Sequence, residues 1–137
     1  MRKGWTLAMC GGIALLGLTV WASEKAPAEF ANAMKISAAA QAAATKAMKE
    51  EDFDTVEKEA AKIVEAFPAV EKYWSVRAPD VVPMARVASK AASDLRVSAQ
   101  QRSLEGLEYS YKDLVAACAA CHEAHRVTMP DGTFEIK

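Results

Sequence analysis

Apolar and weakly polar side chains recur every three or four positions near the C-terminus of the chain. The series is Leu104, Leu107, Tyr111, Leu114, Cys118, Cys121 and His125. Steps of three and four place side chains on one face of an α-helix. Gly106 weakens this helix locally without breaking its pattern. The pattern predicts a long amphipathic helix that follows a capping-box pattern at 98–101. The sequence "MPDG" at 129–132 predicts a turn, and a short tail ends the protein.

Two helices are predicted in the first half of the chain. Residues 28–49 are rich in Ala, Met, Lys and Gln and contain no Gly or Pro, which favours a helix. A second capping box at 54–57 marks the start of the next helix. Its apolar face is formed by Val56, Ala60, Ile63 and Phe67. Pro68 is expected at the end of this helix or just beyond it.

A longer loop is expected over residues 69–80, followed by a third helix. Pro79 and Pro83 bracket its start, with Asp80 as the expected cap. Its inner face is predicted to consist of Met84, Ala88, Ala91 and Leu95. Strand-like alternation is missing, so the fold class is all-α. Four helices with mostly short connections predict an antiparallel, up-down-up-down four-helix bundle.

The first 22 residues have the features of an export signal. Arg2 and Lys3 precede an apolar stretch of about 14 residues, short for a membrane span of about 20. Cleavage after Ala22 would leave residues 23–137 as one domain, with an uncleaved anchor as the alternative. The mature chain would lose Cys10 and be mildly acidic, with no basic footprint for nucleic acid. We expect export to the periplasm and no stable membrane association.

Candidate chemistry is concentrated in "CAACH" at 118–122. Cys118, Cys121 and His122 fall on one helix face, where two thiols can add to the vinyl groups of a haem and an imidazole can reach its iron. C-x-x-C-H is the attachment signature of c-type haem. Three other interpretations are a dithiol redox pair, a zinc site that adds His125, and a structural disulfide. The dithiol pair is disfavoured because it lies near a helix C-terminus, where the helix dipole does not lower a thiol pKa. The zinc site is disfavoured because one helix face cannot surround a tetrahedral ion. The disulfide is disfavoured because it would be strained within one helix.

The chain resembles the class II cytochromes c, the cytochrome c′ superfamily. The resemblance is carried by C-A-A-C-H at 118–122, Arg126 four residues after His122, "NAMK" at 32–35, "EEDFDTVEKEAAKI" and Trp74 in the expected loop. It implies one covalent haem c per chain, a four-helix bundle and, in many members, a homodimer packed through the first two helices. The chain departs from the family at His125, where an aromatic residue is common, and we expect His125 to pack beside the haem.

The resemblance leaves two functions open, which differ in the sixth iron ligand. Met34 is about 9 Å into the first helix, and His122 is about 7–8 Å from the end of the antiparallel fourth helix, so they fall at similar heights. Met34 is therefore the expected ligand of a low-spin electron carrier with a separate redox partner. Met84 and, more remotely, Met129 are alternatives. An open site would instead bind nitric oxide or carbon monoxide.

The remaining pocket residues are expected from their positions. Phe30 and Tyr111, with Leu114, are expected to line the haem, and Lys35 and Arg126 to meet its propionates. No acid–base pair, activated nucleophile or phosphate-binding loop is apparent, so no enzymatic activity is expected. A thiol oxidoreductase remains the alternative if no haem is attached.

Overall fold

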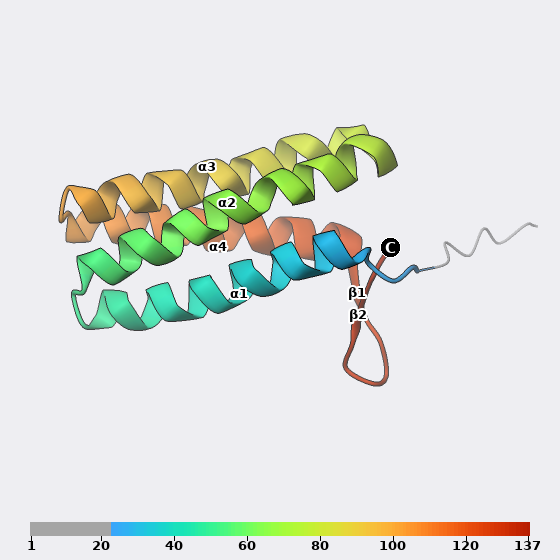
Figure 1. Ribbon diagram of the computed structural model, residues 1–137, viewed down its shortest axis with the longest axis horizontal. Helices are drawn as coiled ribbons and strands as arrows, with labels where there is room; N and C mark the ends of the chain where they lie inside the picture. The colour runs from blue at the N-terminus through green and yellow to red at the C-terminus, as the bar shows by residue number, and fades with distance from the viewer. Residues whose placement is uncertain (1–22) are drawn as a thin grey trace, which may run out of the picture.

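The computed structural model describes residues 23–137, and most of them lie in four long helices (Figure 1). These are α1 (Ala28–Lys49), α2 (Phe53–Arg77), α3 (Val82–Gln100) and α4 (Leu104–His125), with a short 3₁₀ helix, η1 (Pro79–Val81), before α3. The prediction of four helices is confirmed. The expected signal at 1–22 lies outside the described residues. Within 23–137, no helix is both long and apolar enough to cross a membrane.

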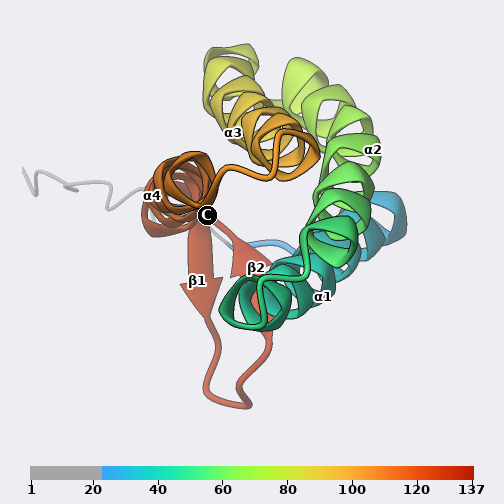
Figure 2. The same ribbon diagram turned by 90° about the vertical axis from the view of Figure 1, so that its left-hand side faces the viewer.

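The helices lie side by side, and each packs against the next one along the chain. The turns that join α1 to α2 and α3 to α4 lie at one end of the molecule, and the α2–α3 connection lies at the other (Figure 1). Among the described residues, α1 and α4 share no comparable interface, and Figure 2 shows them facing each other across the open side of the arrangement. This side is where the cavity described below lies.

The second helix is longer than predicted. α2 continues through Pro68 to Arg77, so the expected loop at 69–80 is wrong and Trp74 lies in a helix. Val70 and Trp74 are buried and continue the apolar face of the earlier turns. Pro68 is exposed. Proline has no N–H to bond to the carbonyl four residues earlier, and on an exposed side of the helix this carbonyl can bond to water instead. Burial of the last two turns therefore outweighs the cost of the proline.

The predicted caps were also misplaced. Asp52, not Asp54, caps α2, because its carboxylate accepts hydrogen bonds from the backbone N and Oγ1 of Thr55, at 3.0 and 2.6 Å. These bonds lower the pKa of Asp52. Ser103 caps α4, whereas Ser98 is buried inside α3. Asp80 makes no cap, because α3 is preceded by η1. A side-chain oxygen caps a helix only where a backbone N–H of the first turn, two or three residues later, is free to bond to it, so the sequence motif alone does not identify the cap.

The C-terminal tail is structured, which the sequence interpretation missed. β1 (Arg126–Thr128) and β2 (Phe134–Ile136) form an antiparallel hairpin, and the predicted turn between them is confirmed by a 2.9 Å bond from Gly132 N to Met129 O. Glu24 bonds through its backbone to Ile136, at 2.9 and 2.8 Å. Ile136 is buried in the core. The hairpin is therefore fastened across the end of the helices at which the described chain begins.

Candidate functional site

A cavity of about 410 Å³ lies between the four helices and the hairpin. Its walls come from α1, α2, α3, α4 and both strands of the hairpin, and most of the side chains are apolar. We call the part of the molecule that contains it (residues 23–41, 63–88 and 112–137) the cavity end, and the remainder (42–62 and 89–111) the closed end. Residues of both α1 and α4 line this cavity.

The wall contributed by α4 carries the haem-attachment residues expected from the sequence. Cys118, Cys121 and His122 all line the cavity and are half-buried. His125 lines it one turn later, with its ring centroid 5.0 Å from that of Trp74. Both cysteines are free thiols. One face of one helix therefore presents two sulfur nucleophiles and an imidazole to a single enclosed space.

Burial disfavours the charged form of each of these three groups. It raises the pKa of both thiols, and the neighbouring Cys121 raises that of Cys118 further. Burial lowers the pKa of His122, with a smaller contribution from the positive charge of Arg126. Reactive dithiol pairs have the opposite property, since their thiol pKa is depressed. A neutral imidazole, in contrast, has the lone pair that metal ligation requires.

Two of the three candidate methionines line the cavity. Met34 reaches it from α1 and Met84 from α3, and both are partly buried. Met129 lies outside the lining, as does Met48, which packs against the core elsewhere. The structure thus brings Met34 and His122 to one cavity, and it leaves Met84 as an alternative ligand.

The other expected pocket residues divide into two groups. Phe30, Lys35 and Arg126 line the cavity. Phe30 is buried, whereas the two cationic residues are exposed. Tyr111 is not part of the lining, because its hydroxyl lies 2.6 Å from Thr45 Oγ1 and joins α4 to α1 at the closed end.

Sequence reasoning missed the wall formed by α2. This wall is made by Ile63, Phe67, Val70 and Trp74. Their spacing of four, three and four is present in the sequence, but Pro68 in the middle predicts a helix end. The hairpin residues Phe134, Glu135 and Ile136 were missed as well, and nothing in their local pattern indicates a cavity wall.

Two buried polar atoms beside the cavity have no hydrogen-bond partner. They are Ser37 Oγ on α1 and Trp74 Nε1 on α2. Buried polar groups are nearly always paired, and an unpaired one costs about 1–3 kcal/mol. Water or a polar group of a molecule bound in the cavity would satisfy such atoms.

These residues fit a haem. The apolar walls suit the porphyrin, the two thiols suit its vinyl groups, and His122 suits its iron. Lys35 and Arg126 suit its carboxylates. Within residues 23–137, no three His, Cys, Asp or Glu side chains are grouped as a metal ion would require, so the zinc arrangement considered from the sequence is not seen.

Comparisons with known proteins add nothing to this assignment. No family model, no curated protein and no solved structure matches the chain. The residues of the cavity and their arrangement are therefore the basis for inferring its function.

Proposed function

We propose that this protein is an exported, periplasmic electron carrier with one covalent haem c. The observation that carries the proposal is the common cavity of Cys118, Cys121, His122 and Met34, which lie on helices at opposite ends of the described chain. The helix contacts and the alternating positions of the connections support an up-down-up-down bundle as its scaffold.

Each residue has a defined part in the proposal. The thiols of Cys118 and Cys121 would hold the haem by addition to its two vinyl groups, where one S–H bond and one C=C π bond give one C–S and one C–H bond and nothing leaves. His122 would bind the iron through a ring nitrogen, and Met34 would supply the second protein ligand through its sulfur. When bound, haem supplies an iron that cycles between the ferric and ferrous states. The surrounding apolar side chains exclude water and thereby help to set the potential.

Attachment is tested by exporting the protein through a c-type maturation pathway and denaturing it. We expect the pigment to stay on the polypeptide, with no thiol left to alkylate. The double variant Cys118→Ala/Cys121→Ala should lose all covalent pigment. Colourless wild-type protein with two free thiols would contradict the proposal and would favour the thiol oxidoreductase alternative.

The sixth ligand is tested by absorption spectra of three methionine variants. Met34→Ala should convert a low-spin spectrum into a high-spin one that shifts with carbon monoxide. Met84→Ala and Met48→Ala should keep the low-spin spectrum, and Met48 is the matched control because it packs against the core outside the cavity. If only Met84→Ala has the effect, Met84 is the ligand. A wild-type protein that is already high-spin and binds carbon monoxide would instead support the gas-binding function.

The assembly proposals come from the family resemblance alone. They are a homodimer packed through α1 and α2 and a separate redox partner protein. Sedimentation at micromolar concentration tests the dimer, and a monomer at all concentrations would exclude it.

A further inference from the structure

Trp74 is buried in a way that leaves its one polar atom without a partner. The residue is 2% exposed, and Nε1 has no hydrogen bond. Its ring is held by aromatic neighbours, since its centroid lies 6.0 Å from that of Phe30, 4.9 Å from Tyr73 and 5.0 Å from His125. The indole is thus fixed in place at the wall of the cavity.

The unpaired indole N–H is more informative than the unpaired Ser37 hydroxyl. A serine hydroxyl can rotate, and in a helix it can bond to a carbonyl one turn earlier. An indole N–H only donates, and its direction is set by the ring. Packing that fixes Trp74 therefore fixes an unpaired donor on a side chain that lines the cavity.

The charges around this end of the cavity favour an anionic acceptor. Lys35 and Arg126 line the cavity, and among the described residues neither forms an ion pair. Arg126 instead lies over the Phe134 ring, 4.3 Å from its centroid. The opposing charge is Glu135, which also lines the cavity but accepts a hydrogen bond from Ser23 Oγ. Two cations and one N–H donor thus remain for a ligand.

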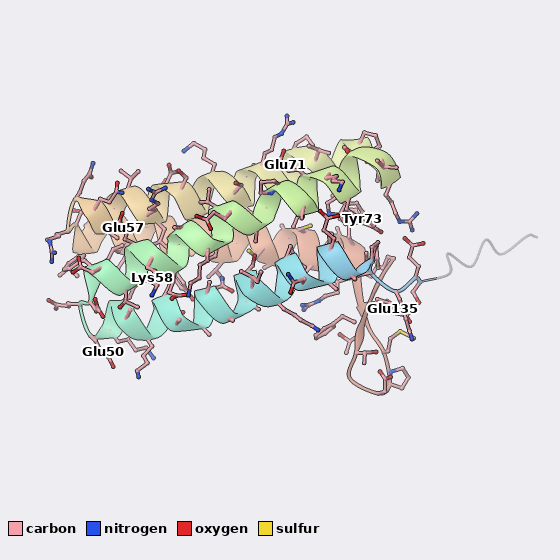
Figure 3. The ribbon with its side chains drawn as sticks, in the orientation of Figure 1. Glu50, Glu57, Lys58, Glu71, Tyr73 and Glu135 are labelled. Carbon is pink, nitrogen blue, oxygen red and sulfur yellow. The ribbon has the colours of Figure 1, made fainter. Side chains whose placement is uncertain are left out.

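Position along the helices separates this polar end from the apolar depth of the cavity. Trp74 lies in the last turn of α2, and Arg126 directly follows α4, whereas Ile63 and Leu114 lie deeper in the helices. Tyr73, the neighbour of Trp74, and Glu135 both lie at the end of the molecule where these helix ends meet (Figure 3). An amphipathic ligand would place its acidic groups at this end.

We propose that Trp74 Nε1 donates a hydrogen bond to a carboxylate of the ligand in the cavity, a haem propionate under the proposed function on which this inference rests. Trp74 is then a positioning residue, because it fixes the carboxylate end of the cofactor while α4 fixes the vinyl edge. A charged acceptor also makes this bond stronger than one between neutral groups.

The direct test is ultraviolet resonance Raman spectroscopy of the indole N–H in the exported protein. Trp74 is the only tryptophan in residues 23–137, and subtraction of the Trp74→Phe spectrum removes any contribution from Trp5 and Trp21. We expect a strongly hydrogen-bonded indole in the pigmented protein and a weakly bonded one in Cys118→Ala/Cys121→Ala. An identical indole signal in the two proteins would overturn the inference.

Two further variants keep the result interpretable. Glu135→Gln should leave the indole signal unchanged, and a shift there would show that Glu135 is the acceptor and contradict the proposal.

Trp74→Phe should lower the midpoint potential, because a propionate without its donor stabilises ferric iron. Tyr73→Phe should leave the potential unchanged, since Tyr73 bonds to Glu24 at 2.9 Å and lies outside the lining. Equal potentials for Trp74→Phe and wild type would also overturn the inference.

Failure of this inference is distinct from failure of the proposed function. Colourless wild-type protein removes both. Pigmented protein with an unbonded indole removes only the role of Trp74.

Discussion

The two ends of this molecule are built from the same four helices but are packed in different ways. At the closed end, the side chains of Ala44, Val56 and Leu95 have no exposed surface. Glu57 and Lys58, on the outer face of α2, mark this end in Figure 3. Its polar groups are paired across helices: Tyr111 with Thr45 at 2.6 Å, and Ser110 with Ser98 at 3.2 Å, although in both pairs either hydroxyl can be the donor.

The cavity end shows the opposite properties. It contains a void of about 410 Å³, two half-buried thiols, and two buried polar atoms without partners. Natural sequences depart from close packing and polar pairing mainly at functional sites. The closed end is therefore the tightly packed part of the helical arrangement, and under the proposed function a haem would fill the cavity end.

A matched pair of leucines on α4 tests this comparison most strongly. Leu107 and Leu114 are each 1% exposed, but only Leu114 lines the cavity. In the Cys118→Ala/Cys121→Ala chain, Leu107→Ala should cost about 3–5 kcal/mol, and Leu114→Ala about 2–3 kcal/mol because it borders space that is already empty. Urea unfolding measures both. In pigmented protein, only Leu114→Ala should shift the haem spectrum, and equal shifts would contradict the distinction between the ends.

Hydrogen exchange should separate the two ends when the ligand is removed. A group that contacts only the folded cavity end stabilises that end against local opening. Comparing wild type with Cys118→Ala/Cys121→Ala, we expect exchange protection in the helices of the cavity end to fall by about 10-fold to 100-fold, where each tenfold corresponds to about 1.4 kcal/mol. Amides at 44–60 and 92–110 should change much less. A uniform loss would mean that the two ends unfold as one unit.

The close approach of α3 to α4 at the closed end predicts a penalty for Gly106→Ala. Alanine favours a helix by about 1 kcal/mol over glycine. However, its Cβ would lie 2.8 Å from Ser98 Oγ and 3.0 Å from Ser103 Oγ, so the side chain of Ser98, which is paired with Ser110, must shift. We expect a net loss of about 1–2 kcal/mol. Adding Ser98→Ala should restore most of it, and no restoration would place the strain elsewhere.

The smallest expected effect is that of Tyr111→Phe. It removes the bond to Thr45, whose hydroxyl keeps its 2.8 Å bond to Gln41 O, so the cost should be about 1 kcal/mol. The spectrum should not change, because Tyr111 lies outside the cavity lining. Tyr109→Phe is the control, since Tyr109 is 70% exposed and two residues away on the same helix. A spectral change in Tyr111→Phe alone would mean that Tyr111 contacts the haem.

The elements with an uninterrupted pattern were the ones predicted best. α1 runs from Ala28 to Lys49 as expected, and the seven-residue series near the C-terminus lies within α4. The end of α2 was missed because Pro68 is a strong local breaker, and the packing of Trp74 that outweighs it involves Phe30, far away in the sequence. The hairpin was missed because its stability comes from contacts with Glu24 and the helix ends.

The candidate site divides in the same way. The grouping of Cys118, Cys121 and His122 follows from helical periodicity, and the matching height of Met34 follows from helix rise and direction. Neither argument could exclude Met84, which also lines the cavity, or place Tyr111 outside it.

The sequence by itself determined where helices form and which residues of α4 share a face, because both depend on interactions within one or two helical turns. Tertiary structure alone decided that α2 continues past Pro68, that a hairpin closes one end, and that Trp74 is buried with an unpaired N–H. These outcomes depend on contacts between segments far apart in the chain, whose energies no local pattern records.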